Sequence, residues 1–408
     1  MGKISSVSEI RKHFPALEQQ VNGKRLVYLD NGATAHKPHS VIDLINQMNS
    51  RTNGNIHRAV HELSAQTTAL YEAARRDIQK YLNAAHPEEI IFTSGTTASI
   101  NLVAYSFASK FLNRGDSILI TEAEHHSNIV PWQMVCDMRG AELKVLPVDD
   151  SGNWILESLD KLLDNSVKLV AVSQISNVLG IINPIEAVIT KAHSLGIPVL
   201  IDGAQGVVHT KVDLQKLDCD FYAFSGHKLY GPTGIGVLYG KKELLESMPP
   251  WMGGGDMVES VTLKKTTYAA LPLKFEAGTP NFIGAAALGE AIRFMNQIDL
   301  AAVSIYEKEI VTFLIEELTK IEGVKIFGVS DKKIPLFSIT AEGAYPSDIA
   351  MIMDKLGIAL RSGFMCAEPL MQRFGAESML RASFGMYNTM EEAQIFVEGL
   401  KRALKMLR

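Results

Sequence analysis

Two residues of this chain follow buried, strand-like runs and have side chains that can do chemistry there. Asp202 ends the apolar run IPVLID, so its carboxylate is buried and needs a cationic or N–H partner. Lys228 follows the apolar run FYAFS in the segment FSGHKLYGPTGIG, and a lysine desolvated at such a position becomes a nucleophilic amine. Taken singly, each has an ordinary alternative, because Asp202 can cap the next helix and most lysines lie on the surface.

The segment SGTTASIN (94–101) offers an anion-binding site. Gly95, Thr96 and Thr97 stand at the start of a predicted helix, where free amide groups and two hydroxyls can hold a phosphate. An ordinary helix-capping threonine is the alternative. The segment matches neither G-x-x-x-x-G-K-S/T nor G-x-G-x-x-G, so a nucleotide is not the expected ligand. Together with the strand-end carboxylate and amine, in this chain order, the phosphate cradle predicts a site for pyridoxal phosphate (PLP).

The three cysteines differ in their local sequence. Cys366 stands in SGFMCAEP, a loop bounded by glycine and proline, which suits an exposed and mobile thiol. By itself this is equally consistent with a nucleophile and with a packed loop thiol, since reactive cysteines need access and a charged neighbourhood. Cys136 and Cys219 are expected to be inert buried thiols. The wide spacings show neither a disulfide framework nor a zinc site, so we expect no metal and a reducing, cytoplasmic setting.

Two adjacent histidines follow the apolar run SILITE. His125 is placed to stack on a ring bound at the strand ends, whereas His126 points elsewhere if the backbone is extended there. Taken alone, either histidine is more often structural, because its ring nitrogens are easily satisfied by the backbone.

Short apolar runs that alternate with helical patterns must position these residues. The runs are apolar on both faces, which is typical of a parallel sheet covered on both sides. The alternation favours a doubly wound α/β domain, in which ligands bind outside the carboxyl ends of the strands. The predicted strands are 89–93, 117–122, 168–173, 198–202, 221–225 and 235–240, and the predicted helices are 97–113, 128–139, 156–164 and 184–195.

The length of 408 residues favours two domains. We expect a large, mostly parallel α/β domain over 21–285 that binds PLP. Near residue 285 the sequence pattern changes from alternating short strands and helices to long helices. Strands are predicted at IPLFSIT and LRASFG, and a closing helix at MEEAQIFVEGLKRALKML. Residues 1–20, with Ser6 or Ser8 as a helix cap, and residues 286–408 should form a smaller α+β domain that carries the cysteine loop.

Composition and charge exclude several other classes. The net charge of -5, with no basic run of five, argues against a nucleic-acid partner. The N-terminus lacks an apolar stretch long enough for a signal peptide. The longest apolar runs are far shorter than the ~20 residues of a membrane span, so we expect no membrane partner.

Nine segments together resemble the class V aminotransferase family, in the family's order and over nearly the whole chain. They are YLDNGATAHKP, GNIHRAVHELSAQTT, FTSGTTASINLVA, EAEHHSNIVPWQ, SNVLG, DGAQ, FSGHKLYGPTGIGVLYG, EAGTPN and RSGFMCAEPLM. Within that family, HHSN…PW and SGxxCA resemble the cysteine desulfurases of the SufS/CsdA type (group II). The resemblance implies a PLP-dependent transferase fold (fold type I), a homodimer, and release of sulfur from L-cysteine. The products would be L-alanine and a persulfide on Cys366, passed to an acceptor protein in iron–sulfur cluster or sulfur-cofactor assembly.

The resemblance also implies a role for each matching residue. Lys228, Cys366 and His125 would be catalytic, with Lys228 bound to PLP, Cys366 attacking the substrate sulfur and His125 stacked on the ring. The remaining cofactor contacts would be Asp202 to the ring nitrogen, Gln205 to the ring hydroxyl, Thr96, Thr97, Ser225 and His227 to the phosphate, and Thr279 to the phosphate of the other subunit. The substrate would be bound by Asn177, Arg361 and Arg381, since a guanidinium meets a carboxylate with two parallel hydrogen bonds.

One departure from the family pattern keeps alternatives open. This branch usually has two histidines directly before the cysteine, where this chain has Phe364 and Met365. A selenocysteine lyase, or another class V enzyme in which Cys366 is dispensable, is therefore the second hypothesis. A third is a non-enzymatic PLP sensor or sulfur-carrier docking protein, against which the intact Lys228, Asp202 and Arg381 argue.

Overall fold

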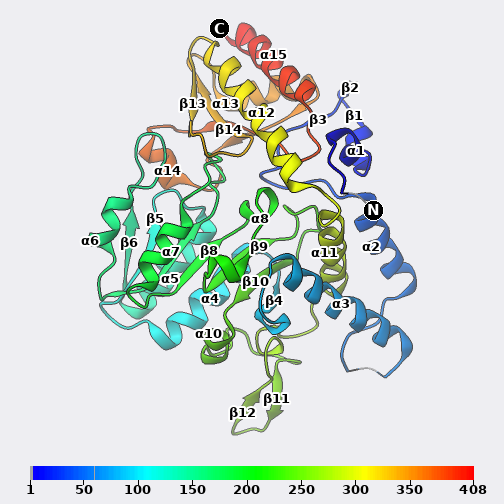
Figure 1. Cartoon of the computed structure of the whole chain (residues 1–408), viewed down its shortest axis with the longest axis vertical. Helices are drawn as coiled ribbons and strands as arrows, with labels where there is room; N and C mark the ends of the chain where they lie inside the picture. Colours follow the sequence, from blue (N-terminus) through cyan, green and yellow to red (C-terminus); the bar gives the residue numbers. More distant parts are fainter. Residues whose placement is uncertain (1–2, 59) are drawn as a thin grey trace.

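The larger part of the chain forms one seven-stranded sheet with a hydrophobic cluster on each face (Figure 1). The computed structural model describes residues 3–58 and 60–408. The strand order is β4–β10–β9–β8–β7–β5–β6, and every neighbouring pair is parallel except the two that β10 makes. The predicted mostly parallel sheet is confirmed. Its strands are β4 (Ile90–Thr93), β5 (Ser117–Thr121), β6 (Glu142–Leu146), β7 (Val167–Ser173), β8 (Val199–Asp202), β9 (Phe221–Ser225) and β10 (Gly236–Gly240).

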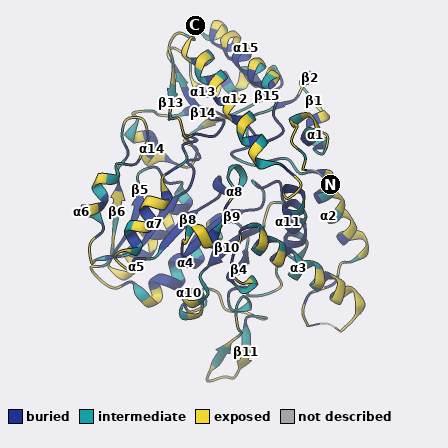
Figure 2. Ribbon diagram, viewed as in Figure 1, coloured by how far each residue is buried: buried dark blue, intermediate teal, exposed yellow. Residues whose placement is uncertain are grey.

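Both faces of this sheet are apolar, as the uninterrupted hydrophobic runs predict. In β5, Leu119 belongs to one hydrophobic cluster, whereas Ile118 and Ile120 belong to the cluster on the opposite face. Figure 2 shows the result, a buried sheet beneath helices whose outer surfaces are exposed. The sequence does not predict β6, which is an edge strand of the sheet and is partly exposed.

Helices connect these strands and begin where the predicted motifs lie. α4 (Thr96–Phe111) starts three residues after β4, and α5 (Val130–Arg139) follows β5 after the short 3₁₀ helix η3 (His126–Asn128). The predicted helix over 156–164 is interrupted, because a 3₁₀ turn precedes α6. The remaining elements are α2 (His39–Arg51), α3 (Glu62–Tyr81), η2 (Pro87–Glu89), η4 (Leu156–Ser158), α6 (Leu159–Leu162), α7 (Ile185–His193), α8 (Gly206–His209), α9 (Leu214–Leu217), α10 (Lys242–Ser247), β11 (Val258–Val261), β12 (Thr266–Tyr268), η5 (Leu273–Phe275) and α11 (Phe282–Met295).

A second, smaller sheet carries the C-terminal part of the chain, at the top of Figure 1. Its order is β13–β14–β17–β16, with all pairs antiparallel, and a third hydrophobic cluster packs it against helices. The predicted strands at 334–340 and 380–385 and the closing helix are confirmed. The elements are α12 (Leu300–Thr319), β13 (Val324–Phe327), β14 (Leu336–Ala341), α13 (Pro346–Lys355), β15 (Ile358–Ala359), β16 (Arg361–Gly363), α14 (Glu368–Arg373), β17 (Met379–Ser383) and α15 (Met390–Leu407).

The N-terminal residues join this smaller part. The first helix is capped by Ser6, whose hydroxyl accepts the N–H of Glu9, and Arg11 pairs with Glu392 of α15 at 2.9 Å. Further along, β3 pairs in parallel with β15. These N-terminal elements are α1 (Val7–Arg11), η1 (Pro15–Glu18), β1 (Gln20–Val21), β2 (Lys24–Arg25) and β3 (Val27–Tyr28).

The boundary between the two parts does not coincide with a loop. α11 crosses the predicted division at 285/286 and packs against α2 and α3 of the larger part. The assignment of 21–285 to one domain, and of 1–20 with 286–408 to the other, stays a prediction. Across the described residues, no helix has both the length and the apolar character that crossing a membrane requires.

Candidate active site

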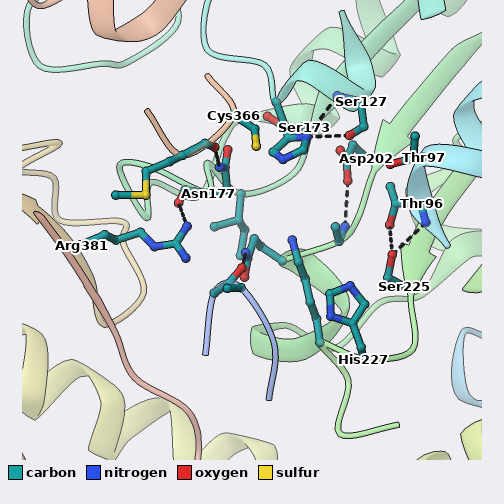
Figure 3. A pocket seen from close by; sticks show the side chains of 18 of the residues that line it. Thr96, Thr97, Ser127, Ser173, Asn177, Asp202, Ser225, His227, Cys366 and Arg381 are labelled. Atoms are coloured by element: carbon teal, nitrogen blue, oxygen red, sulfur yellow. Dashed lines mark hydrogen bonds between the residues drawn. The ribbon is translucent and has the colours of Figure 1, made fainter. Parts of the chain in front are cut away.

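A cavity of about 280 Å³ lies at the carboxyl ends of the parallel strands (Figure 3). Its walls come from the residues that follow β5, β7, β8 and β9, from the start of α4, and from β16, β17 and the loop before α14. This is the edge at which ligands bind in open α/β sheets. The predicted site residues that line the cavity are Thr96, Thr97, His125, Asn177, Asp202, Gln205, Ser225, His227, Lys228, Arg361, Cys366 and Arg381.

The start of α4 forms an anion cradle on one side of the cavity. Gly95 has a φ of +151°, and a Cβ on it would lie 3.2 Å from Ser225 Oγ, so glycine permits this close approach. The backbone N–H of Thr96 donates to Ser225 Oγ at 2.8 Å, and the hydroxyls of these two residues are also 2.8 Å apart. The N-cap residue of α4 is Gly95, which has no side chain to accept the other first-turn N–H groups, so these groups are available to a ligand. This is the donor set that a phosphate needs.

Asp202 and Lys228 line the same cavity from neighbouring strand ends. Asp202 is 6% exposed, and its Oδ1 accepts the N–H of Ala204 at 2.9 Å. Burial raises the pKa of this carboxyl, against the opposing effects of Ala204 and Lys228. Burial also lowers the pKa of the Lys228 amine to about 8, although Asp202 acts in the other direction. A buried acid for the ring nitrogen and a reactive amine for the aldehyde are what PLP requires, so the residues present fit this cofactor.

His125, Gln205 and His227 contribute further polar groups to the cavity walls. His125 Nδ1 accepts the N–H of Ser127 at 3.1 Å, which leaves the proton of the neutral ring on Nε2. Burial, aided by nearby cations, lowers the pKa of both His125 and His227 to about 4, so both rings are neutral at pH 7. Gln205 Nε2 donates to the carbonyl of Gly32 at 2.9 Å, which fixes its side chain at the cavity wall.

Two arginines line the cavity, and both contact Asp30. Arg381 is 3% exposed and donates from Nη1 to the carbonyl of Asn177 at 3.0 Å and from Nη2 to Asp30 Oδ1 at 3.1 Å. Its Nε is buried and has no hydrogen-bond partner among the described residues. Burial lowers the pKa of Arg381, yet a guanidinium stays charged in proteins. An unpaired N–H on a buried cation beside a cavity suits a carboxylate ligand.

The loop between β16 and α14 holds Cys366 exposed at this cavity. Met365 and Cys366 both adopt left-handed backbone conformations, with φ of 52° and 53°, which is unfavourable for residues other than glycine. Asn177 Nδ2 donates to the carbonyl of Met365 at 2.8 Å, and the backbone N–H of His126 donates to that of Cys366 at 2.7 Å. The ring of His126 accepts the N–H of Glu368 at 3.2 Å. These three bonds hold the loop in its strained shape.

Comparison with known proteins identifies the family. The model of the aminotransferase class-V family matches residues 27–396. The chain belongs to the class V aminotransferase family.

Its relatives in that family are similar over nearly the whole chain. A cysteine desulfurase of Serratia proteamaculans (strain 568) is 47% identical over 98% of this chain and 99% of its own length. A cysteine desulfurase of Synechococcus elongatus is 46% identical over 97% of this chain, which spans 63% of that longer relative. The crystal structure of the cysteine desulfurase CsdA from Escherichia coli, in an S-sulfonic acid form, is 41% identical with a TM-score of 0.93 and covers 99% of this chain and 100% of its own.

These similarities confirm several predictions for this class V family member. The PLP-dependent transferase fold is confirmed, as is the cysteine desulfurase function of the SufS/CsdA type. PLP is the cofactor and L-cysteine the substrate. The roles of individual residues stay predictions.

Thr279 is the predicted site residue that does not line the cavity of its own chain. It is exposed, in the segment between η5 and α11. A second cavity of about 290 Å³ borders the cradle, and its walls are Ser94, Gly95, Thr96, Thr97, Ala98, Ser225, His227, Thr233 and Gly234. The role of Thr279 at the site of another subunit stays a prediction.

Cys136 and Cys219 are buried, as expected for inert thiols. Burial raises the pKa of Cys136 to about 11 and raises that of Cys219 further. Neither thiol lines the active-site cavity, so Cys366 is the cysteine that a substrate in this cavity can meet.

The sequence reasoning missed Asp30 and Glu124. Glu124 is fully buried and accepts the hydroxyl of Thr121 at 2.6 Å, the N–H of Ser173 at 3.0 Å and the amide of Asn128 at 2.8 Å. Burial raises the pKa of its carboxyl to about 7. Through these bonds Glu124 ties the turn that carries His125 to strand β7. Each of the two acids stands within a quoted motif. Glu124 does not end an apolar run, whereas Asp30 directly follows the apolar run LVYL (26–29), so the signal that found Asp202 is present there too.

Proposed function

We propose that Lys228, Arg381 and Cys366 divide the desulfurase reaction between them. The observation that supports this most directly is that an amine, a buried guanidinium with a free N–H and an exposed thiol line one cavity. Asp202, Lys228 and the cradle at α4 would hold PLP. When bound, PLP supplies an electron sink for the negative charge that develops at the substrate Cα.

The chain's own residues then perform the remaining work. Lys228 removes the Cα proton, because a pKa of about 8 makes its amine an effective base near neutral pH. Arg381 orients the substrate by its carboxylate. The Cys366 thiolate attacks the sulfur of L-cysteine, so that an S–S bond forms and the C–S bond breaks. The electron pair of the broken bond stays on the substrate. Protonation of Cβ, with Nε2–H of His125 as donor, and return of a proton to Cα from Lys228 give L-alanine and leave a persulfide on Cys366.

This scheme balances without an external oxidant or reductant. L-cysteine and the Cys366 thiol give L-alanine and the Cys366 persulfide. We propose that the persulfide passes to an acceptor protein in iron–sulfur cluster or sulfur-cofactor assembly, which the exposure of Cys366 supports. We also propose a homodimer, supported by the exposed position of Thr279, and a cytoplasmic setting, supported by three unpaired cysteines.

The test compares variants of the holoenzyme. Cys366→Ala should keep the visible absorption of bound PLP and lose alanine and sulfide production from L-cysteine by at least ~100-fold, since the covalent nucleophile is gone. Cys136→Ala is the matched control and should leave both measurements unchanged. Lys228→Ala should lose the Schiff-base absorption band. Full activity in Cys366→Ala would contradict the assignment of the nucleophile.

A second candidate function is selenocysteine lyase activity, which Phe364 and Met365 favour. Those residues stand where the branch usually has two histidines, so the thiol lacks their polarising effect. A selenium substrate needs less help from that thiol because its C–Se bond is weaker. Equal turnover of selenocysteine by Cys366→Ala and by the unchanged enzyme, with turnover of L-cysteine absent from both, would select this alternative.

A further inference from the structure

Asn177 touches both the active-site cavity and the loop that carries Cys366. It is buried and lines the cavity, and its Nδ2 donates to the carbonyl of Met365, the residue before the cysteine, at 2.8 Å. Its backbone carbonyl accepts Nη1 of Arg381 at 3.0 Å, which places it beside the predicted anchor of the substrate carboxylate. Asn177 therefore stands between the expected position of that carboxylate and the backbone of the cysteine loop.

The side-chain amide of Asn177 can hold the loop and a ligand at the same time. Its Nδ2 carries two N–H groups, and the carbonyl of Met365 takes one of them. Within residues 3–58 and 60–408, Nδ2 has no second hydrogen-bond acceptor, so a carboxylate bound to Arg381 can take the other N–H without displacing the loop. A side chain held at both N–H groups loses its freedom to rotate away from either partner.

The turn that carries Asn177 is held by bonds that do not use its side chain. Ser176 Oγ accepts the N–H of Val178 at 3.3 Å, and the carbonyl of Val178 accepts the hydroxyl of Ser338 at 2.6 Å. Asn177→Ala should therefore keep the shape of the turn and remove only the contact between the turn and the cysteine loop.

We propose that Asn177 is a positioning residue that couples occupancy of the substrate site to the order of the cysteine loop. A carboxylate in the cavity fixes the Asn177 side chain, and the fixed side chain holds the carbonyl of Met365. The strained left-handed backbone at Met365 and Cys366 then opens less often. The thiol is thus best ordered when a sulfur is present for it to attack. The inference rests on the proposed function, in which Arg381 binds the substrate carboxylate.

Hydrogen exchange of the loop, followed by mass spectrometry with and without L-alanine, tests this coupling. L-alanine has the amino and carboxylate groups of cysteine but no sulfur to lose, and the visible absorption of PLP in the holoenzyme reports its binding. The N–H of Ala367 donates to the carbonyl of Phe364 at 3.0 Å, so its exchange reports opening of the loop. Saturating L-alanine should slow this exchange by about threefold, the effect of arresting the rotation of one side chain.

Three variants separate this coupling from other causes of protection. In Asn177→Ala, Ala367 should exchange faster without ligand and should not respond to L-alanine, which is again added until the PLP absorption is saturated. Asn177→Asp keeps the size of the side chain but cannot donate to Met365 when ionised, so it should behave in the same way. His126→Ala is the matched control, because it removes a bond to the loop from outside the cavity and leaves Asn177 intact. Its response to L-alanine should remain.

The possible results distinguish this inference from the proposed function. If L-alanine binds but leaves the exchange of Ala367 unchanged or speeds it, the coupling does not exist. Equal slowing in the unchanged enzyme and in both Asn177 variants would show that the ligand shields the loop directly, which also overturns the inference alone. A holoenzyme whose absorption responds to neither L-alanine nor L-cysteine would overturn the proposed function as well.

Discussion

At the scale of single residues, the chemistry depends on how burial tunes Lys228. An amine with an ordinary pKa of 10.5 is almost fully protonated at pH 7 and is then neither a nucleophile nor a base. Burial lowers this pKa to about 8 while Asp202 raises it. Below pH 8 the amine is mostly protonated, and above it mostly neutral. We therefore predict that its reactivity in the PLP-free protein rises through a midpoint near pH 8.

Competitive labelling with acetic anhydride measures this midpoint, with each lysine-containing peptide quantified by mass spectrometry. Lys401, exposed on α15, is the internal reference, because its hydrogen bond to Glu398 raises its pKa, and it should react with a midpoint at higher pH. Asp202→Asn removes the charge that raises the pKa, so it should move the midpoint of Lys228 lower still. Equal midpoints for the two lysines would show that the cavity does not desolvate the amine.

Residue-level prediction from the sequence succeeds where a polar residue ends an apolar run. Asp202 ends the strand β8 and Lys228 closely follows β9, so both lie at the sheet edge and line the cavity. Asp30 also ends an apolar run, LVYL (26–29), but its role depends on contacts with β16 and β17, hundreds of positions away, which the sequence does not reveal. The sequence also gives no hint that the side chain of Asn177 bonds to the cysteine loop.

At the scale of elements, His126 acts as a clamp on the loop that carries Cys366. Its backbone N–H holds the carbonyl of Cys366, and its ring holds the N–H of Glu368 at the start of α14. His126→Ala keeps the first bond and loses the second, which contributes about 1 kcal/mol. The strained left-handed loop should then open about fivefold more often.

Hydrogen exchange of residues 363–368 and the rate of alkylation of Cys366 by iodoacetamide check this prediction. Both should increase several-fold in His126→Ala. His193→Ala is the control. It removes a histidine that bonds Asp220 at 2.8 Å, at the amino end of β9 and therefore away from the active-site cavity. Unchanged exchange in the loop would mean that the ring of His126 does not clamp it.

Element-level prediction from the sequence is good for buried strands and poor for short or edge elements. The six predicted strands of the large sheet all form, because a run that is apolar on both faces can be buried only within such a sheet. β6 escapes prediction because its edge position lets polar residues alternate with apolar ones. The 156–164 region forms a 3₁₀ turn followed by the four-residue helix α6, in place of one continuous helix.

At the scale of the whole molecule, a buried ion pair fixes the segment that presents Thr279. Arg75 and Glu276 are almost fully buried and 2.8 Å apart, and Tyr71 donates to the same carboxylate at 2.8 Å. The N–H of Gly278 donates to the carbonyl of Gly255 at 2.9 Å. Thr279 is thus exposed on an anchored segment, a geometry that suits contact with a second molecule better than a flexible tip would.

Mixing two variants, one impaired in PLP binding and one without the reactive lysine, tests whether Thr279 completes the site of a partner. Thr279→Ala should weaken PLP binding by about tenfold, the effect of losing one phosphate hydrogen bond. In a mixed dimer with Lys228→Ala, the Thr279→Ala chain keeps its own Lys228 and receives the intact threonine of its partner. We predict that its PLP affinity is restored, as measured by the Schiff-base absorption at limiting PLP. Restoration cannot occur if Thr279 serves its own chain, because the site with the intact lysine would then still lack its threonine.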